Sequence, residues 1–189
     1  MKYQKIEVLD KVAKVVYLVQ PSPVVLVSTV DTAGVKNLAP YAMFTPCSTC
    51  PPMVALGISP KSDTFKNISK TGEFVVGIPT SKILTQLYQA ANEYPPAVDE
   101  FEETGLTPYA RNKVKPARIA ECAVNLECKL QWHKEAGNHH VVVGLVVAAD
   151  IDKELFSEDK IKLRSAIPQV YHLTSGTFLV DGKVIDVKH

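Results

Sequence analysis

Long apolar runs and a net charge of one sign are both missing from this sequence of 189 residues. The longest apolar run covers residues 141–149, whereas a helix that crosses a bilayer needs about 20 such residues, so no membrane partner is expected. The 21 Lys and Arg residues nearly balance the 20 Asp and Glu residues, which leaves a net charge of +1. Without a broad basic field, the chain is not expected to bind nucleic acid.

Glycine-rich and hydrolase motifs are also missing. The nine glycines include no G-x-G-x-x-G and no P-loop, which argues against a Rossmann dinucleotide site. No G-x-S-x-G or H-E-x-x-H supports hydrolase chemistry. The first ten residues lack the apolar stretch of a signal peptide, and four cysteines are too few for a disulfide scaffold. We therefore expect a cytoplasmic protein with reduced thiols.

Apolar and β-branched runs bounded by turn residues predict six strands, over residues 24–30, 36–44, 54–59, 73–78, 122–133 and 140–151. The turn sequence at 31–34 makes the first two an antiparallel hairpin. Helices separate only some of the strands. This order favours a mainly β (α+β) fold, an antiparallel barrel with peripheral helices, over a doubly wound parallel sheet.

Two helices are predicted, one from Ser62 or Asp63 to Lys70 and one from Ser81 to the proline pair at 95–96. Residues 92–118 contain four prolines and are expected to form an irregular excursion over the surface. Alternation around Asp181-Gly182 predicts a terminal hairpin over residues 177–187.

The segment from Ser59 to Thr64 leaves a predicted strand and opens a predicted helix. Backbone N–H groups, the hydroxyls of Ser62 and Thr64 and the ammonium group of Lys61 can converge there on a phosphate. The alternative is a helix N-cap beside a solvated lysine.

Cys47 and Cys50 form a C-x-x-C motif, the pattern of a redox dithiol or of half a zinc site. Neither context fits well, because Pro51 disfavours helical angles at Cys50 and a strand follows. Cys122 and Cys128 lie six residues apart in a predicted strand and make no compact second ligand pair. Small loop and core cysteines are the alternative, and no metal site is assigned.

His139 and His140 open a predicted strand and should face opposite sides of it. One of them at most can enter a given site. A solvated or hydrogen-bonded histidine is the alternative. The acidic run at residues 99–103 is expected to form a solvated surface.

Several short sequence motifs, in this order along the chain, resemble those of one known family. They are Pro21-x-Pro23 before 24–31, Asn37-x-Ala39-Pro40-Tyr41, Pro51-Pro52, 61–68, 71–76, 100–107, 121–128 and Gly137-Asn138-His139. From about residue 20 to 152 the chain resembles the flavin reductase-like family of FMN-binding split barrels, which includes flavoredoxins and reductase components of two-component monooxygenases. Ala42 and Cys50 depart from the Ser and Asp common in that family, and Asn138 replaces an acid.

The resemblance implies one FMN-binding domain over residues 1–189, folded as an antiparallel split β-barrel, in a homodimer with FMN near the interface. It favours the phosphate interpretation of the helix start. It also implies that His139 contacts the flavin or lines the nicotinamide side, as a candidate catalytic residue. The cofactor-binding residues expected from it are Asn37, Tyr41, Ala42, Met43, Phe44, Cys47, Ser48, Ser59, Lys61, Ser62, Thr64, His139 and His172.

Three functions remain open. The first is an NAD(P)H-dependent flavin reductase, in which FMN takes a hydride from NADH or NADPH and passes electrons to free flavin, a ferric complex or an electron-acceptor protein. The second is a flavoredoxin-like electron carrier with little NAD(P)H activity. The third is a non-flavin barrel in which Cys47 and Cys50 bind a metal or cycle as a dithiol.

Overall fold

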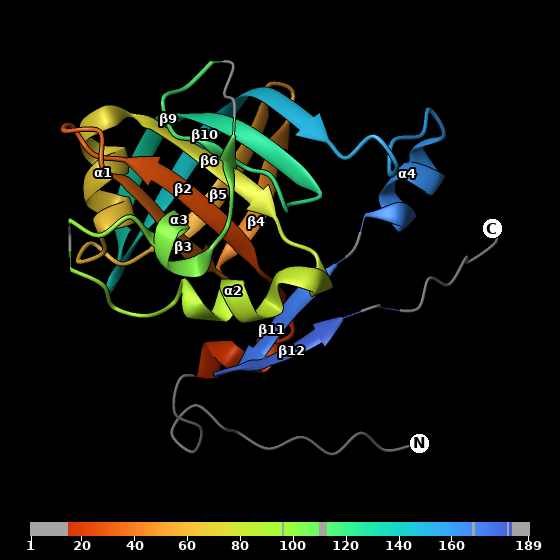
Figure 1. Ribbon diagram of the computed structural model, residues 1–189, viewed down its shortest axis with the longest axis horizontal. Helices are drawn as coiled ribbons and strands as arrows, with labels where there is room; N and C mark the ends of the chain where they lie inside the picture. Colours follow the sequence, from red (N-terminus) through yellow and green to blue (C-terminus); the bar gives the residue numbers. More distant parts are fainter. Residues whose placement is uncertain (1–14, 96, 110–112, 168, 181, 183–189) are drawn as a thin grey trace, which may run out of the picture.

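A computed structural model of the chain describes residues 15–95, 97–109, 113–167, 169–180 and 182. A seven-stranded antiparallel sheet in the order β3-β2-β6-β9-β10-β5-β4 curls into a barrel (Figure 1). Its strands are β2 (Val25–Val30), β3 (Lys36–Tyr41), β4 (Phe44–Thr49), β5 (Pro52–Ile58), β6 (Glu73–Ile78), β9 (Val124–Ala136) and β10 (His139–Ile151). The predicted hairpin of the first two barrel strands, β2 and β3, is confirmed, with Val27 opposite Ala39.

The barrel is open between β3 and β4, which are consecutive in the chain but lie at the two ends of the strand order. The prediction of one strand over residues 36–44 is wrong, because a bend at Ala42-Met43 separates β3 from β4. The Gly57 N–H donates to the Met43 carbonyl at 2.8 Å and fixes this bend against β5. The opening confirms the expected split barrel.

Two hydrophobic clusters share the barrel wall. Successive side chains of a strand face opposite sides, so Val25 and Val27 of β2 enter the barrel interior with Phe74, whereas Leu26 packs outside it. Every residue of β2 is therefore buried. The outer cluster needs a second layer to cover it.

The helix predicted after Ser62 is confirmed as α1 (Asp63–Thr71). The Ser62 hydroxyl accepts the Phe65 N–H at its start. Gly72, at a φ of 71°, ends it in a left-handed conformation that suits glycine. Both ends are thus set by local sequence.

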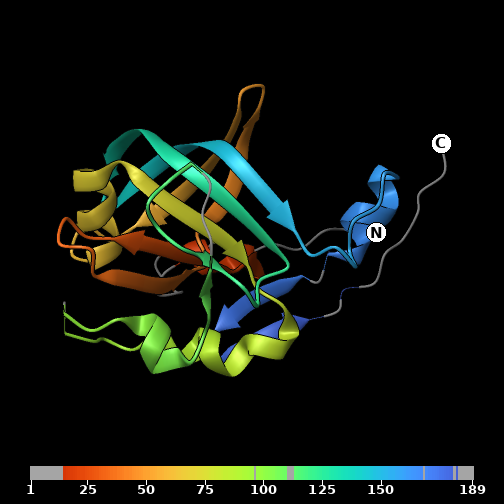
Figure 2. The ribbon, with the colours of Figure 1, turned by 45° about the horizontal axis from the view of Figure 1, so that its top comes forward.

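The second layer consists of a 3₁₀ turn (η2, Ser81–Ile83), α2 (Leu84–Gln89) and α3 (Glu100–Thr104), and Figures 1 and 2 show α2 and α3 against the outer side of β3. The predicted second helix is confirmed at its start, as η2 and α2, but it ends at Gln89, before the proline pair at 95–96. The expectation that residues 92–118 run irregularly over the surface is wrong in part, because Phe101 and Leu106 are buried in the outer cluster. Two short strands, β7 (Pro108–Tyr109) and β8 (Arg118–Ile119), also lie within this segment.

A separate three-stranded sheet joins the two ends of the described chain. It pairs β1 (Ser22–Pro23), which follows a 3₁₀ turn (η1, Val15–Val19), with β11 (Val170–Thr174), and β11 with β12 (Thr177–Val180). The turn between β11 and β12 lies at Ser175-Gly176. In the terminal hairpin predicted over residues 177–187, the first strand corresponds to β12, and most of the second lies outside the described residues. The helix α4 (Lys160–Ala166) precedes the sheet.

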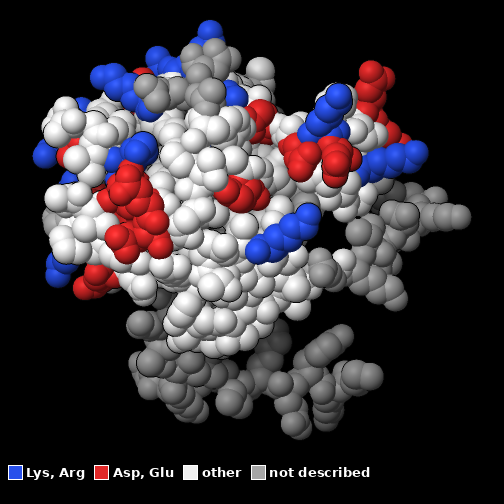
Figure 3. Space-filling model, in the orientation of Figure 1, with Lys and Arg blue, Asp and Glu red and all other residues white. Residues whose placement is uncertain are grey.

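Figure 3 shows acidic and basic side chains of this face in separate small groups. Within the described part of the chain, no helix has the length and apolar character needed to cross a membrane.

Candidate functional site

A cavity of about 1200 Å³ lies beside the barrel opening. Its walls come from β3, the bend after it, the end of β5, the start of α1, and the segments around residues 90–94 and 16–23. It exceeds the roughly 300–1000 Å³ of ordinary small-molecule sites. Eleven of the thirteen predicted cofactor-binding residues line it: Asn37, Tyr41, Ala42, Met43, Phe44, Ser59, Lys61, Ser62, Thr64, His139 and His172.

The start of α1 presents two backbone donors toward this cavity. The hydroxyls of Ser62 and Thr64 are committed inside the protein, because Ser62 donates to the Ser59 carbonyl at 2.8 Å and Thr64 to the Asn37 Oδ1 at 3.0 Å. Among the hydrogen bonds of the described residues, none uses the N–H of Asp63 or Thr64. These two N–H groups and the exposed Lys61 are therefore the donors open to an anion.

Asn37 has a side-chain orientation fixed by its hydrogen bonds. Its Oδ1 accepts from the hydroxyls of Thr29 at 3.1 Å and Thr64 at 3.0 Å, and its Nδ2 donates to Glu100 at 2.8 Å. Asn67 donates to the Thr29 hydroxyl at 3.1 Å and extends the network under α1. The second N–H of the Asn37 amide has no partner among the described residues, so it remains a donor at the cavity wall.

Glu100 is the only carboxylate of the acidic run at 99–103 that lines the cavity. It is 9% exposed, and its two oxygens accept from the Asn37 amide and from the Leu38 N–H at 3.1 Å. Burial raises its pKa above the ordinary value, and these donors oppose that rise. The expectation of a solvated surface is wrong for Glu100, because α3 turns it toward β3.

Apolar side chains and backbone line the cavity near the bend. Met43 is 42% exposed there, and a Cβ added at Gly57 would lie 3.0 Å from the Met43 side chain. A side chain at position 57 would therefore require Met43 to shift. Burial raises the pKa of the Tyr41 phenol, which donates to Ser62.

The two cavity histidines are held by different partners. His139 bonds through Nδ1 to the Asn138 Oδ1 at 2.8 Å. His172 Nε2 lies 3.2 Å from the Ser175 carbonyl, which fixes that nitrogen as the donor. Its buried Nδ1 has no partner among the described residues and is therefore an unused acceptor.

Cys47 and Ser48 do not line the cavity. A bulge between Pro46 and Ser48 carries β4 outward into the projecting hairpin seen in Figure 2, where the Ser48 hydroxyl donates to the Pro51 carbonyl at 2.6 Å. Cys47 and Cys50 are exposed free thiols. Across the described ranges, no group of three or more His, Cys, Asp and Glu residues is placed to hold a metal ion.

Several cavity residues were not predicted from the sequence, among them Val16, Val19, Glu100 and the residues at 90–94. The Asp99 cap and Gly105 stop bracket α3 in the sequence and were the available signal for Glu100. Nothing local marks Val16 or Val19, since these residues reach the cavity only through the pairing of β1 with β11.

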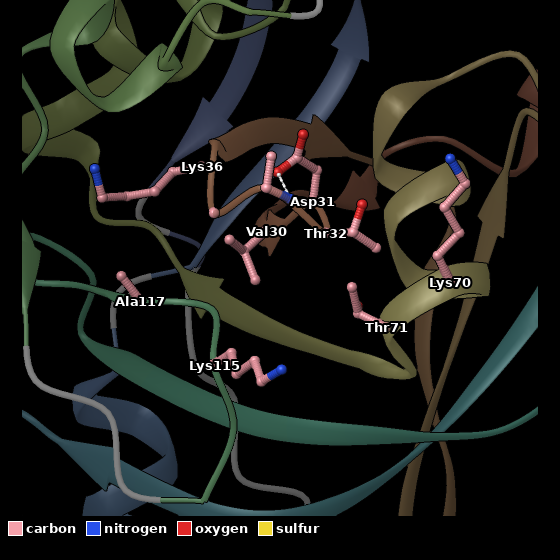
Figure 4. Close-up of a pocket in the computed structure, with 10 residues that line it drawn as sticks. Val30, Asp31, Thr32, Lys36, Lys70, Thr71, Lys115 and Ala117 are labelled. Atoms are coloured by element: carbon pink, nitrogen blue, oxygen red, sulfur yellow. Dashed lines mark hydrogen bonds between the residues drawn. The ribbon is translucent and has the colours of Figure 1, made fainter.

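A smaller cavity of about 560 Å³ lies at the β2–β3 turn (Figure 4). Figure 4 shows its three lysines, Lys36, Lys70 and Lys115, extending in different directions. Lys36 is already paired with Asp99, and Asp31 holds the turn by accepting the N–H groups of Ala33 and Val35. Its cations do not converge, so the larger cavity is the better candidate site.

Comparisons with known proteins agree with this geometry. Residues 19–175 match the flavin reductase like domain. An uncharacterised protein of Aquifex aeolicus (strain VF5) is 33% identical over 147 residues, which cover 75% of each chain. Nitrilotriacetate monooxygenase component B from Bacillus cereus has a similar fold, with a TM-score of 0.86 at 22% identity over 99% of this chain and 100% of that one. Flavoredoxin of Desulfovibrio vulgaris (Miyazaki F) gives 0.80 at 22% identity over 98% and 97%. The resemblance seen in the sequence is thus confirmed, and the chain belongs to the flavin reductase-like domain family.

Proposed function

We propose that this protein binds FMN in the large cavity and acts as an NAD(P)H-dependent flavin reductase. One observation carries the proposal: the start of α1 offers two free N–H groups beside Lys61 at the wall of a cavity of about 1200 Å³, in a chain of this family. Phosphate is one of the anions that a helix N-terminus binds through its free N–H groups. The cavity leaves room for a second ligand beside one cofactor.

The phosphate end would be held by Lys61 and by the N–H groups of Asp63 and Thr64. Ser59 and Ser62 would shape the loop, since the Ser59 carbonyl accepts from both the N–H and the hydroxyl of Ser62. Asp63 is paired with Lys66 at 2.8 Å, which reduces its repulsion of a phosphate. The hydroxyls of Ser62 and Thr64 thus serve the protein and not the ligand, unlike the sequence prediction.

The ring would lie beside Tyr41, Ala42, Met43 and Phe44. Met43 offers a polarizable apolar surface, while the free amide N–H of Asn37 offers a donor for its polar edge. FMN, when bound, supplies the hydride and electron chemistry, and the protein orients it. His139, oriented by Asn138, is the candidate to line the nicotinamide side.

A homodimer is part of this proposal. Val16 and Val19 at the cavity rim are 60% and 78% exposed, and such apolar side chains favour cover by a second copy. We also propose that the protein acts in the cytoplasm and passes electrons to free flavin or to an acceptor protein. Sedimentation with and without FMN tests the dimer, and a monomer in both would exclude it.

The visible spectrum of the protein after incubation with FMN and removal of free flavin tests the cofactor. Retained flavin bands are expected, and their bleaching after anaerobic addition of NADH or NADPH supports the reductase. Bands that persist with both nucleotides would instead identify a flavoredoxin-like carrier. A protein that retains no FMN would exclude both, and Cys47 and Cys50 would become the next candidates.

A further inference from the structure

The outer end of the β9–β10 hairpin carries a pair of histidines outside the cavity described above. His133 on β9 and His140 on β10 lie on one face of the sheet, with their Nδ1 atoms 3.3 Å apart. His140 is the chain neighbour of the cavity residue His139 but faces the other way, as expected for adjacent residues of a strand. The proposed flavin site therefore makes no use of this pair.

Phe65 of α1 holds both rings in place. Its ring centroid lies 5.2 Å from that of His133, edge to face, and 4.5 Å from that of His140. Phe65 itself packs against the barrel interior, and both strands are fully paired at this point, with His133 opposite Val142 and His140 opposite Glu135. The two imidazoles are thus positioned by the fold and do not meet by chance on mobile loops.

The separation of the two nitrogens matches a metal chelate. With metal–nitrogen bonds of about 2.05 Å, nitrogens 3.3 Å apart subtend an angle of about 107° at the metal, close to the tetrahedral value. A hydrogen bond between two neutral rings is the alternative explanation of the same contact. In that case one Nδ1 carries a proton, and this nitrogen cannot act as a metal ligand. Imidazole nitrogens select Zn²⁺, Cu²⁺ and Ni²⁺ over Mg²⁺ and Ca²⁺.

We propose that His133 and His140 form a two-histidine site for an imidazole-preferring divalent cation such as Zn²⁺. Both histidines coordinate through Nδ1, which requires that each neutral ring carries its proton on Nε2. Water completes the coordination, because the described residues hold no third ligand in place. Glu135 lies directly opposite His140 on the same face and is the side chain nearest in register to supply a carboxylate oxygen. The cation clamps β9 to β10 at the end of the hairpin.

Zinc titration by calorimetry tests the site, with ZnCl₂ as the probe and the full chain without an affinity tag. Exposed thiols such as those of Cys47 and Cys50 are also able to bind zinc, so the experiment uses the Cys47→Ser/Cys50→Ser background. We expect one zinc ion per chain, and a loss of at least about tenfold in affinity for His133→Gln and for His140→Gln. Lys134→Gln, which alters the neighbour of His133 on the opposite face of β9, is the matched control and should bind zinc as the parent does.

The melting temperature separates loss of the site from loss of the fold. His133 is exposed, so His133→Gln without zinc should melt like the parent and should lose the rise in melting temperature that zinc gives the parent. Zinc binding that is unchanged in the His133→Gln/His140→Gln double variant would overturn the proposal, as would no binding to the parent. Neither result depends on FMN, so the test is independent of the proposed function.

Discussion

Two buried glutamates sit in opposite kinds of environment. Glu127 of β9 has no exposed surface and meets Arg118 at 2.7 Å, and Arg118 also contacts Asp150 at 2.9 Å. Glu100 at the cavity accepts hydrogen bonds from the neutral donors of Asn37 and Leu38. Both carboxylates accept backbone N–H groups, but Glu127 is also paired with the cation of Arg118, whereas Glu100 is held by neutral donors beside an open cavity.

This difference indicates that the Arg118 network has a structural role, whereas the Glu100 network shapes the candidate site. The Arg118 network closes the seam where β8 meets β9, and burial with the neighbouring Asp150 raises the pKa of Tyr109 to about 12, so its phenol stays protonated. The Glu100 network instead orients Asn37 and, through it, Thr64 at the start of α1. Damage to the first should cost stability, whereas damage to the second should cost ligand affinity.

The largest effect is expected from Arg118→Met. Removal of the cation breaks the ion pairs that Arg118 makes with the buried Glu127 and with Asp150, which costs about 3–5 kcal/mol of unfolding free energy. Urea unfolding measures this loss, and the exposed Lys134→Met on the same sheet is the control, with a change of about 0.5 kcal/mol or less. Equal losses in the two variants would contradict the charge-compensated role of Arg118.

Glu100→Ala should have a smaller effect on stability and a clear one on FMN. It leaves the Leu38 N–H and the Asn37 amide without their acceptor, at a cost of about 1–3 kcal/mol. Because Asn37 can then rotate, FMN affinity should fall as well, which a fluorescence titration measures. Glu100→Gln keeps one acceptor oxygen and should retain more affinity than Glu100→Ala. Full FMN affinity in Glu100→Ala would make Glu100 a structural residue like Glu127.

Lys61→Ala tests the phosphate end of the cavity. An exposed ammonium–phosphate contact contributes about 1 kcal/mol, or roughly a fivefold change in affinity for FMN. Riboflavin lacks the phosphate, so its affinity should not change. Lys70→Ala, at the far end of α1, is the matched control. Equal losses for FMN and riboflavin would remove Lys61 from the phosphate site.

The pH dependence of stability gives the smallest effect. Burial raises the pKa of Glu100 above its ordinary 4.5, so folding disfavours the charged form. The native state therefore gains from Glu100 below its ordinary pKa and loses that gain as the pH rises through the raised one. Relative to Glu100→Gln, the wild type should become less stable in urea unfolding as the pH rises above the ordinary pKa of 4.5. A difference that stays flat would show that the pKa of Glu100 is not raised.

Local signals explain which elements could be predicted. The Ser62 cap and Gly72 stop fixed α1 within a residue, and long alternating runs identified β9 and β10. β4 was missed because Pro46 to Cys50 contains little apolar sequence, and its strand form depends on pairing with β5. α3 was missed because Phe101 finds its burial only against the outer face of the barrel.

The same contrast holds for the site. The sequence by itself determined the helix start at Lys61-Ser62-Asp63, the strand carrying Asn37 and the family, because these depend on neighbours along the chain. Only the tertiary structure decided that Thr64 donates to Asn37 instead of to a ligand, that Glu100 lines the wall of the cavity, and that Cys47 does not line it. The hydrogen bonds of Asn37 join it to Thr64, 27 positions away, and to Glu100, 63 positions away. No local sequence pattern encodes such contacts.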